Sequence, residues 1–295
     1  MNILITGITG FIGKNFFKYS KFKNNILAIS REESVNKYEQ LNNLNFLNCD
    51  LKNINNFSNE IIEFNPECVI NLAWAGIPDY SKSNSMNNVE MNVNFFDFII
   101  NNTKIKKFIN TGTCAEYYNP RGKISEDYIV KPYDDFSLAK INLSKILNDK
   151  CEKLDINFIN LRLFYVYGLY QRRESLIPHI INSYRKGEIP KISKPCTMLD
   201  FIFAEDVINA IDRCLDKDIP SGSYNVGHGE SIYNSEIQKI IAEKLDFEFD
   251  NNIYEKNLDE IEFYADISKL NGLTNWTPKF KIADGIQKVL SGSNK

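Results

Sequence analysis

The sequence predicts an α/β fold: a doubly wound parallel sheet followed by a smaller, mixed α/β lobe. Apolar strand-like segments alternate with helix-like segments through the first half of the chain, as in sheets whose two faces are covered by helices. A glycine-rich turn joins the first strand to the first helix at residues 7–13. Beyond Gly168 the alternation ends, and shorter helices, prolines and irregular stretches follow.

The apolar segments have the length and composition of buried strands. We expect strands at residues 2–6, 25–29, 44–48, 68–73, 107–110 and 157–163, and helices at 14–21, 54–64, 86–101 and 138–153. Right-handed crossovers make such a sheet doubly wound, with ligands beyond the carboxyl ends of its strands. We expect a first domain at residues 1–165 and a second lobe at 166–295, with a segment at about 200–227 returning to the sheet.

The first strand leads into three glycines spaced three residues apart, Gly7, Gly10 and Gly13, and a helix follows. In such a turn the first glycine permits the tight bend, the second lets the backbone approach a pyrophosphate, and the third lets the helix pack against the sheet. Phe11 and Ile12 belong to this turn as predicted cofactor contacts, and the positive end of the following helix then faces a diphosphate. This position after a strand and before a helix predicts a dinucleotide site.

The end of the second strand predicts which dinucleotide is bound. NAD-selective sites normally place a carboxylate there, but this chain has Ser30 and Arg31, with Glu32 and Glu33 just after them. The hydroxyl of Ser30 and the guanidinium of Arg31 can hold a 2′-phosphate. We therefore predict that the protein binds NADP(H), with NAD(H) as the alternative. Arg31 could also be an ordinary exposed arginine that binds no ligand.

The composition restricts the classes of partner. The net charge of −3 gives no electrostatic reason to expect nucleic acid or an anionic membrane. The first strand leaves no room for a signal peptide, and no apolar run approaches the roughly 20 residues of a membrane span. The six cysteines form no C-x-x-C pair, which indicates reduced thiols in a cytoplasmic protein. His179 and His228 have no companions at ligand spacing, so we predict no metal site.

Further motifs follow the later strands. Asn71-Leu72-Ala73 follows the fourth strand, Asn92 lies in the next helix, Thr111-Gly112-Thr113 follows the fifth strand, and Lys140 lies in the helix after that. Together with the glycine turn, they resemble the extended short-chain dehydrogenase/reductases, in particular the nucleotide-sugar epimerase, dehydratase and reductase branch. Later motifs agree, at residues 161–168, 176–178, 200–207 and 275–278. The resemblance spans nearly the whole chain and implies a Rossmann fold; within the branch it extends to reductases of 4-keto-6-deoxy sugars such as the CDP-abequose synthases.

The resemblance implies roles for individual residues. In this family a Ser or Thr, a Tyr and a Lys four residues after the Tyr perform the acid–base chemistry. Thr113 then has the hydroxyl role and Asn92 a supporting role, while Lys140 binds the nicotinamide ribose and lowers the pKa of the tyrosine. Lys140 also has a simpler interpretation as an exposed lysine, and Asp50 as a helix N-cap. The implied cofactor contacts further include Asp50, Leu51, Leu72, Ala73, Thr111, Leu163 and Phe164.

The chain departs from the family pattern at the tyrosine. Phe136 stands four residues before Lys140, and a phenyl ring has no proton to give. Three explanations remain open. The chain is a Tyr→Phe variant that holds substrate without turnover, or another acid replaces the tyrosine, with Tyr133 and Tyr117 nearest in sequence, or the protein binds its ligands without catalysis.

Candidate substrate contacts follow from the same resemblance. Residues 113–117 continue from Thr113 into the sugar pocket through Cys114. Glu116 is either the second acid–base group that dehydratases and epimerases need or an exposed loop carboxylate. Trp74 begins a loop, residues 74–80, which either offers aromatic edges to the sugar or packs over the cleft.

The second lobe contributes the predicted contacts to the nucleotide diphosphate. Arg172 and Arg173, just before Leu176, are either diphosphate ligands or an exposed charged face. Tyr165 and Leu199 stand where related proteins often carry an asparagine and an arginine, so the chain departs from its relatives at both positions.

Taken together, these motifs predict an NADPH-dependent reductase of the 4-keto group of a nucleotide-linked deoxy sugar, for surface-polysaccharide biosynthesis. Arg31 favours reduction, because net reduction draws on the cellular pool of reduced NADP. The alternatives are an epimerase or 4,6-dehydratase that recycles bound NAD, and a silent nucleotide-sugar or NADP-binding protein. By analogy with relatives, helices 86–101 and 138–153 build a homodimer.

Overall fold

The computed structural model describes residues 1–23, 25–31, 44–249 and 262–292. The chain folds into two compact units. Unit 1 is formed by Met1–Tyr118, Ile129–Arg162 and Ile211–Tyr224. Unit 2 is formed by the described residues within Asn119–Tyr128, Leu163–Ala210 and Asn225–Lys295.

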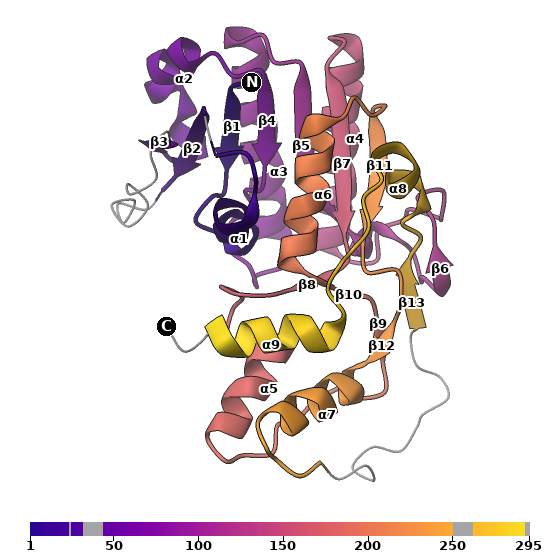
Figure 1. Ribbon diagram of the computed structural model, residues 1–295. Coiled ribbons are helices and arrows are strands. Elements are labelled where there is room, and N and C mark those ends of the chain that lie inside the picture. Colours follow the sequence, from indigo (N-terminus) through magenta and orange to yellow (C-terminus); the bar gives the residue numbers. More distant parts are fainter. Residues whose placement is uncertain (24, 32–43, 250–261, 293–295) are drawn as a thin grey trace. The chain divides into compact units, whose positions relative to one another are not determined.

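The main sheet has seven strands within the described residues, in the order β11-β7-β5-β4-β1-β2-β3 (Figure 1). Their bounds are β1 Ile3–Thr6, β2 Ile26–Ser30, β3 Leu44–Asn48, β4 Cys68–Asn71, β5 Lys107–Thr113, β7 Asn157–Leu163 and β11 Gly222–Val226. β1 pairs in parallel with both β2 and β4. The strand order therefore reverses at β1, which is where doubly wound sheets bind ligands. The predicted fold class is confirmed.

Helices cover both faces of this sheet, with α1 on one face and α3 and α4 on the other (Figure 1). The helical elements are α1 Phe11–Tyr19, η2 Leu51–Phe57, α2 Ser58–Phe64, α3 Lys82–Asn102, η3 Cys114–Glu116, α4 Asp135–Lys153 and α6 Ala204–Asp216, whose last turns lie in unit 1. Phe95 and Phe96 of α3 and Leu147 of α4 are completely buried in one core cluster. Burying such a side chain contributes about 1.5–3 kcal/mol each.

Capping residues explain where the observed helices differ from the predicted ones. α3 begins at Lys82, one turn before the predicted residue 86, because the Ser81 hydroxyl accepts a hydrogen bond from the Asn84 N–H. α4 begins at Asp135 because the Asp134 carboxylate accepts from the Ser137 N–H at 2.7 Å. The predicted helix at 54–64 is a 3₁₀ segment followed by a short α-helix.

Unit 2 contains two small sheets within its described residues, β10-β8 and β12-β9-β13-β6. Its elements are β6 Gly122–Ile124, β8 Tyr165–Tyr167, α5 Leu176–Arg185, β9 Met198–Leu199, β10 Phe201–Phe203, the start of α6, β12 Ile232–Tyr233, α7 Asn234–Lys244, β13 Glu262–Ala265, α8 Ser268–Thr274 and α9 Ile282–Gly292. The completely buried Asp200 carboxylate accepts backbone hydrogen bonds from His228, Gly229 and Ala265 at 2.6–3.0 Å. One aspartate thus joins three segments of this unit.

The chain passes between the two units at several points, one of which is Arg162/Leu163, and the domain bounds expected at 1–165 and 166–295 stay a prediction. The segment that returns to the sheet is 211–224, within the expected 200–227. Residues 119–128 belong to unit 2, which the alternation of elements did not predict.

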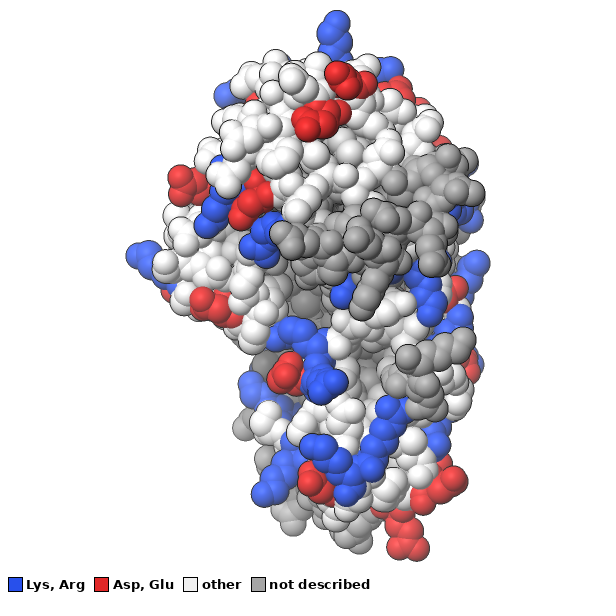
Figure 2. Space-filling view, turned by 90° about the vertical axis from the view of Figure 1, so that its left-hand side faces the viewer, with Lys and Arg blue, Asp and Glu red and all other residues white. Residues whose placement is uncertain are grey.

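No helix in the described part of the chain combines the length and apolarity needed to cross a bilayer. Acidic and basic side chains are interspersed on the face shown in Figure 2.

Candidate active site

The turn after β1 is built as the glycine spacing predicted. Gly7 has φ +70°, and a Cβ atom there would lie 2.7 Å from the carbonyl carbon of Leu72. A Cβ at Gly13 would lie 2.4 Å from the carbonyl oxygen of Gly7. Side chains at these positions would collide with backbone, so the close approach of β1, β4 and α1 requires glycine at both.

The start of α1 can accept a diphosphate. Gly10 is exposed and is the N-cap of α1, with no side-chain cap and no acidic residue in the first turn. Phe11 and Ile12 are partly exposed beside it. The first N–H groups of a helix point outward at its positive end, and negative phosphate oxygens satisfy them. The residues present therefore fit the diphosphate of a dinucleotide.

The ends of β2 and β3 are the next predicted cofactor contacts. Ser30 is buried with its hydroxyl 3.5 Å from that of Thr9, and Arg31 is exposed. Glu32 and Glu33 lie outside the described residues. The Asp50 carboxylate accepts from the Lys52 N–H at 3.0 Å, so the N-cap interpretation of Asp50 is confirmed. Leu51 is buried in the core of unit 1, packed among apolar side chains.

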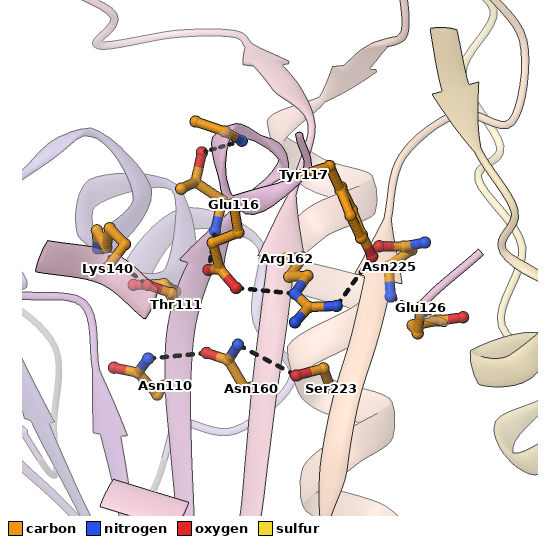
Figure 3. A network of polar contacts seen from close by, with 12 residues as sticks. Asn110, Thr111, Glu116, Tyr117, Glu126, Lys140, Asn160, Arg162, Ser223 and Asn225 are labelled. Atoms are coloured by element: carbon orange, nitrogen blue, oxygen red, sulfur yellow. Dashed lines mark hydrogen bonds and ion pairs between the residues drawn. The ribbon is translucent and has the colours of Figure 1, made fainter. Parts of the chain in front are cut away.

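Lys140 is buried, with 8% of its surface exposed. Its Nζ donates to the carbonyl oxygen of Thr111 at 3.0 Å and lies 4.0 Å from the centre of the Trp74 ring (Figure 3). Burial lowers the pKa of Lys140 to about 8, although the charge of Glu116 acts in the opposite direction. The interpretation of Lys140 as an exposed lysine is wrong, because α4 directs the side chain to the carboxyl end of β5.

Glu116 forms a buried ion pair (Figure 3). It is 1% exposed, one carboxylate oxygen accepts from the Arg162 Nε at 2.8 Å, and the other accepts from the Thr113 N–H at 3.0 Å. A Cβ at Gly112 would lie 2.5 Å from this carboxylate, so glycine leaves the room it needs. The expectation of an exposed loop carboxylate is wrong, because Arg162 of β7 neutralises the charge inside the unit.

Thr113 and Cys114 occupy the turn that follows β5. The Thr113 hydroxyl oxygen accepts from the Ala115 N–H at 3.2 Å, which leaves its own proton free for donation. Cys114 is buried in the same turn. Thr113 therefore can serve as a hydroxyl donor at the carboxyl end of β5.

Phe136 belongs to an aromatic cluster, defined as Trp74, Tyr80 and Phe136. The Phe136 ring centre lies 5.5 Å from Trp74 and 5.0 Å from Tyr80, both edge-on. The indole Nε1 of Trp74 is buried and has no hydrogen-bond partner among the described residues. The cluster thus places the rings of Trp74 and Phe136 beside Lys140, at 4.0 and 6.0 Å from its Nζ, and Tyr80 packs on the Phe136 ring.

The two tyrosines named as substitutes for Phe136 have other surroundings. Tyr117 is completely buried, and its hydroxyl accepts from the Arg162 Nη1 at 3.1 Å. Tyr133 is 61% exposed and precedes α4. Partial burial of its side chain and the neighbouring charge of Asp134 raise its pKa. Tyr117 is therefore enclosed and bonded to Arg162, and the raised pKa of Tyr133 disfavours release of its proton.

A row of hydrogen-bonded polar side chains crosses the sheet. The sequence motifs did not predict that these residues meet. Hydrogen bonds of 2.7–3.4 Å link β1, β4, β5, β7 and β11 through Thr6, Asn71, Asn110, Asn160 and Ser223. Figure 3 shows the last three of these residues. Asn92 joins this row, because its Oδ1 accepts from Asn71 at 2.8 Å. Asn92 is thus a buried link between α3 and the sheet. The sequence pattern that predicts the row is an asparagine within each of three apolar strands.

The remaining predicted residues belong to unit 2, apart from Leu72 and Ala73, which follow β4. The Ala73 N–H donates to the Thr6 hydroxyl at 3.3 Å. Leu163 is partly buried, Phe164 is buried against Phe263, and Tyr165 is 38% exposed and packs on Phe201. Arg172 and Arg173 are exposed before α5, and Leu176 packs against the core of unit 2. No group of three His, Cys, Asp or Glu side chains suited to a metal occurs in the described ranges.

Residues 3–227 match the sequence profile of the NAD dependent epimerase/dehydratase family. The chain belongs to this family. A CDP-abequose synthase from Salmonella typhimurium is 26% identical over 98% of this chain and 97% of its own length. A dTDP-4-dehydro-6-deoxyglucose reductase from Escherichia coli is 26% identical over 98% and 96%.

The fold agrees with this membership. The crystal structure of UDP-glucuronic acid 4-epimerase from Bacillus cereus, in complex with UDP-glucuronic acid and NAD, has a TM-score of 0.85. It covers 99% of this chain and 98% of its own, at 22% identity. The family match and these sequence relatives confirm the predicted resemblance to the extended short-chain dehydrogenase/reductases.

Proposed function

We propose that the protein is an NADPH-dependent reductase of the 4-keto group of a nucleotide-linked 6-deoxy sugar. The observation that supports this most is the hydrogen bond from Lys140 to the carbonyl oxygen of Thr111. Thr111 lies two residues before Thr113, at the carboxyl end of β5. β1 and its glycine turn lie two strands away in the same sheet, separated from β5 by β4. A dinucleotide bound at the turn can therefore extend along this edge toward Lys140.

The chain's own residues divide the work of binding and proton transfer. The glycine turn and the first turn of α1 hold the diphosphate, while the ammonium of Lys140 holds the nicotinamide ribose. When bound, the reduced nicotinamide supplies a hydride to the sugar carbonyl carbon. Thr113 donates a hydrogen bond from its hydroxyl to the sugar oxygen and so orients the sugar.

The Glu116 ion pair supports reduction over dehydration or epimerisation. Dehydratases and epimerases need a second acid–base group, whereas a reductase needs one proton and the hydride. Both oxygens of Glu116 already accept hydrogen bonds, from Arg162 and from the Thr113 backbone. The names of two relatives, a CDP-abequose synthase and a dTDP-4-dehydro-6-deoxyglucose reductase, agree with this choice.

Arg31 is the basis for the proposed preference for NADP(H). We expect NADPH to bind more tightly than NADH, and Arg31→Ala to weaken NADPH binding about tenfold, a loss of about 1.4 kcal/mol. NADH affinity should stay unchanged, because NADH carries no 2′-phosphate. Fluorescence titration of both reduced cofactors measures the two constants. Tighter binding of NADH to the unaltered chain would refute the preference.

Turnover tests the reductase function directly. The purified protein is mixed with NADPH and dTDP-4-keto-6-deoxyglucose or its CDP counterpart, and NADPH oxidation is followed by absorbance. We expect oxidation with a 4-keto sugar and no cofactor retained through gel filtration. Retained NAD together with conversion of an unreduced nucleotide sugar would instead identify an epimerase or dehydratase.

We further propose that the reductase acts in the cytoplasm, in surface-polysaccharide biosynthesis, as a homodimer built through α3 and α4. Sedimentation at several protein concentrations tests the dimer. A monomer at all concentrations contradicts it.

A further inference from the structure

A ketoreductase that carries Phe136 needs a proton donor from another position. The phenyl ring keeps the shape of the usual tyrosine but offers no hydroxyl beside Lys140. The donor must lie close to this ring, since the sugar carbonyl has to meet both the donor and the nicotinamide. The aromatic cluster contains one phenol, that of Tyr80, which packs edge-on against Phe136 at 5.0 Å.

The loop that carries Tyr80 is held in place by α3. The Asn88 side chain exchanges two hydrogen bonds with the backbone of Ala75, at 2.7 and 3.0 Å. The Asn84 amide donates to the carbonyl oxygens of Ala75 and Asp79. Gly76 has φ +81°, and a Cβ there would lie 2.7 Å from the Asn84 side chain. The loop is therefore tied along its length, which positions Tyr80 against the cluster.

The exposure of Tyr80 suits repeated proton donation. The side chain is 46% exposed although one edge packs on Phe136, so solvent reaches the residue. Tyr117, by contrast, is enclosed and bonded to Arg162, and Tyr133 is beside the charge of Asp134. Of these phenols, Tyr80 combines contact with Phe136 and access to water.

We propose that Tyr80 donates the proton to the sugar carbonyl oxygen in place of the hydroxyl that residue 136 lacks. This proposal rests on the proposed reductase function. The O–H bond of Tyr80 breaks as the new O–H bond at the sugar oxygen forms, while the bound reduced cofactor would supply the hydride that the same carbonyl carbon accepts. Tyr80 then recovers its proton from water.

Tyr80→Phe tests the proposal, with NADPH and dTDP-4-keto-6-deoxyglucose as the probe. We expect kcat to fall by about 10²–10⁴-fold, the usual contribution of a general acid. The matched control is Tyr133→Phe, which removes a phenol from a more exposed neighbouring position and should leave kcat close to its original value. The double variant Tyr80→Phe/Phe136→Tyr should recover activity, because it restores a phenol beside Lys140.

A crystal structure with NADP⁺ and the reduced sugar nucleotide supplies a second readout. We expect the Tyr80 Oη within hydrogen-bond distance of the sugar 4-hydroxyl, at about 2.6–3.2 Å. An unchanged kcat for Tyr80→Phe, or an Oη directed away from the sugar, overturns the proposal. Turnover by Phe136→Tyr but not by the unaltered chain also overturns it, while the reductase function stands. No turnover by either refutes the reductase function itself.

Discussion

Lys140→Met should make the protein more stable at about pH 7, by about 1–3 kcal/mol, and weaken binding of the dinucleotide. Burial lowers the pKa of Lys140 from its usual 10.5 to about 8, so the folded protein holds a charge in an unfavourable place. Methionine fills similar space without a charge. Each pKa unit corresponds to about 1.4 kcal/mol, of which the lost hydrogen bond to Thr111 offsets a part.

The pH dependence of this difference follows from proton binding. Between about pH 8 and 10.5 the unfolded chain keeps the proton on Lys140 and the folded chain has lost it. The stability of the unaltered protein therefore rises with pH across this window. The gain is lost as pH falls from about 10.5 to about 8, and below about 8 both states hold the proton. The advantage of Lys140→Met should shrink toward the upper end of the window. Urea unfolding at several pH values measures it.

Lys145→Met is the matched control, since it removes the same charge from an exposed position on the same helix. We expect a change within about 0.5 kcal/mol that does not vary over this pH window. An identical pH dependence of Lys140→Met and Lys145→Met would show that the ammonium of Lys140 is hydrated in the folded protein. If Lys140→Met is more stable but no longer binds the cofactor, the Lys140 charge lowers the stability of the protein and is needed for binding.

Glu116→Ala should destabilise the protein by about 3–5 kcal/mol, because it removes the carboxylate that neutralises the buried Arg162 guanidinium inside unit 1. The pair lies at 2.8 Å with 9% and 1% of the two side chains exposed. Thermal or urea unfolding measures the loss. The control is Asp97→Ala, which breaks the half-exposed pair with Lys150 in the same unit and should cost less than about 1 kcal/mol.

The double variant Glu116→Gln/Arg162→Met separates a structural role from a catalytic one. Removing both charges should recover much of the stability lost in either single variant, and NADPH oxidation should return with it. If Glu116 were an acid–base catalyst, activity would stay absent in the stable double variant. That outcome would also remove the argument that favours reduction over dehydration.

The α/β class and the glycine turn could be predicted because they depend on local pattern. Continuous apolar segments between helices specify a covered parallel sheet, and the three glycines were informative because they follow a strand and open a helix. Lys140 was identified through the family resemblance, in which a lysine lies four residues after the usual tyrosine. Helix starts were less predictable, because Ser81 and Asp134 act as caps from outside the apolar periodicity.

The surroundings of the polar residues could not be predicted. Glu116 has the sequence context of an exposed loop carboxylate, yet Arg162, 46 residues later, makes it a buried ion pair. Likewise, the asparagines that cross the sheet are far apart in sequence and meet because their strands are neighbours. Burial and pairing depend on contacts between distant segments, which a single-sequence pattern does not contain.

By itself, the sequence determined the layered α/β architecture, the turn shaped for a diphosphate, and the phenylalanine that replaces the usual proton donor. Each of these depends on residue type and spacing within a short stretch of chain. Only the tertiary structure decided that Lys140 is buried, that Glu116 pairs with Arg162, and that Tyr80 packs on Phe136. The physical reason is that charge burial and ring contacts arise where separate strands and loops converge, and their energies are set by neighbours that folding brings together.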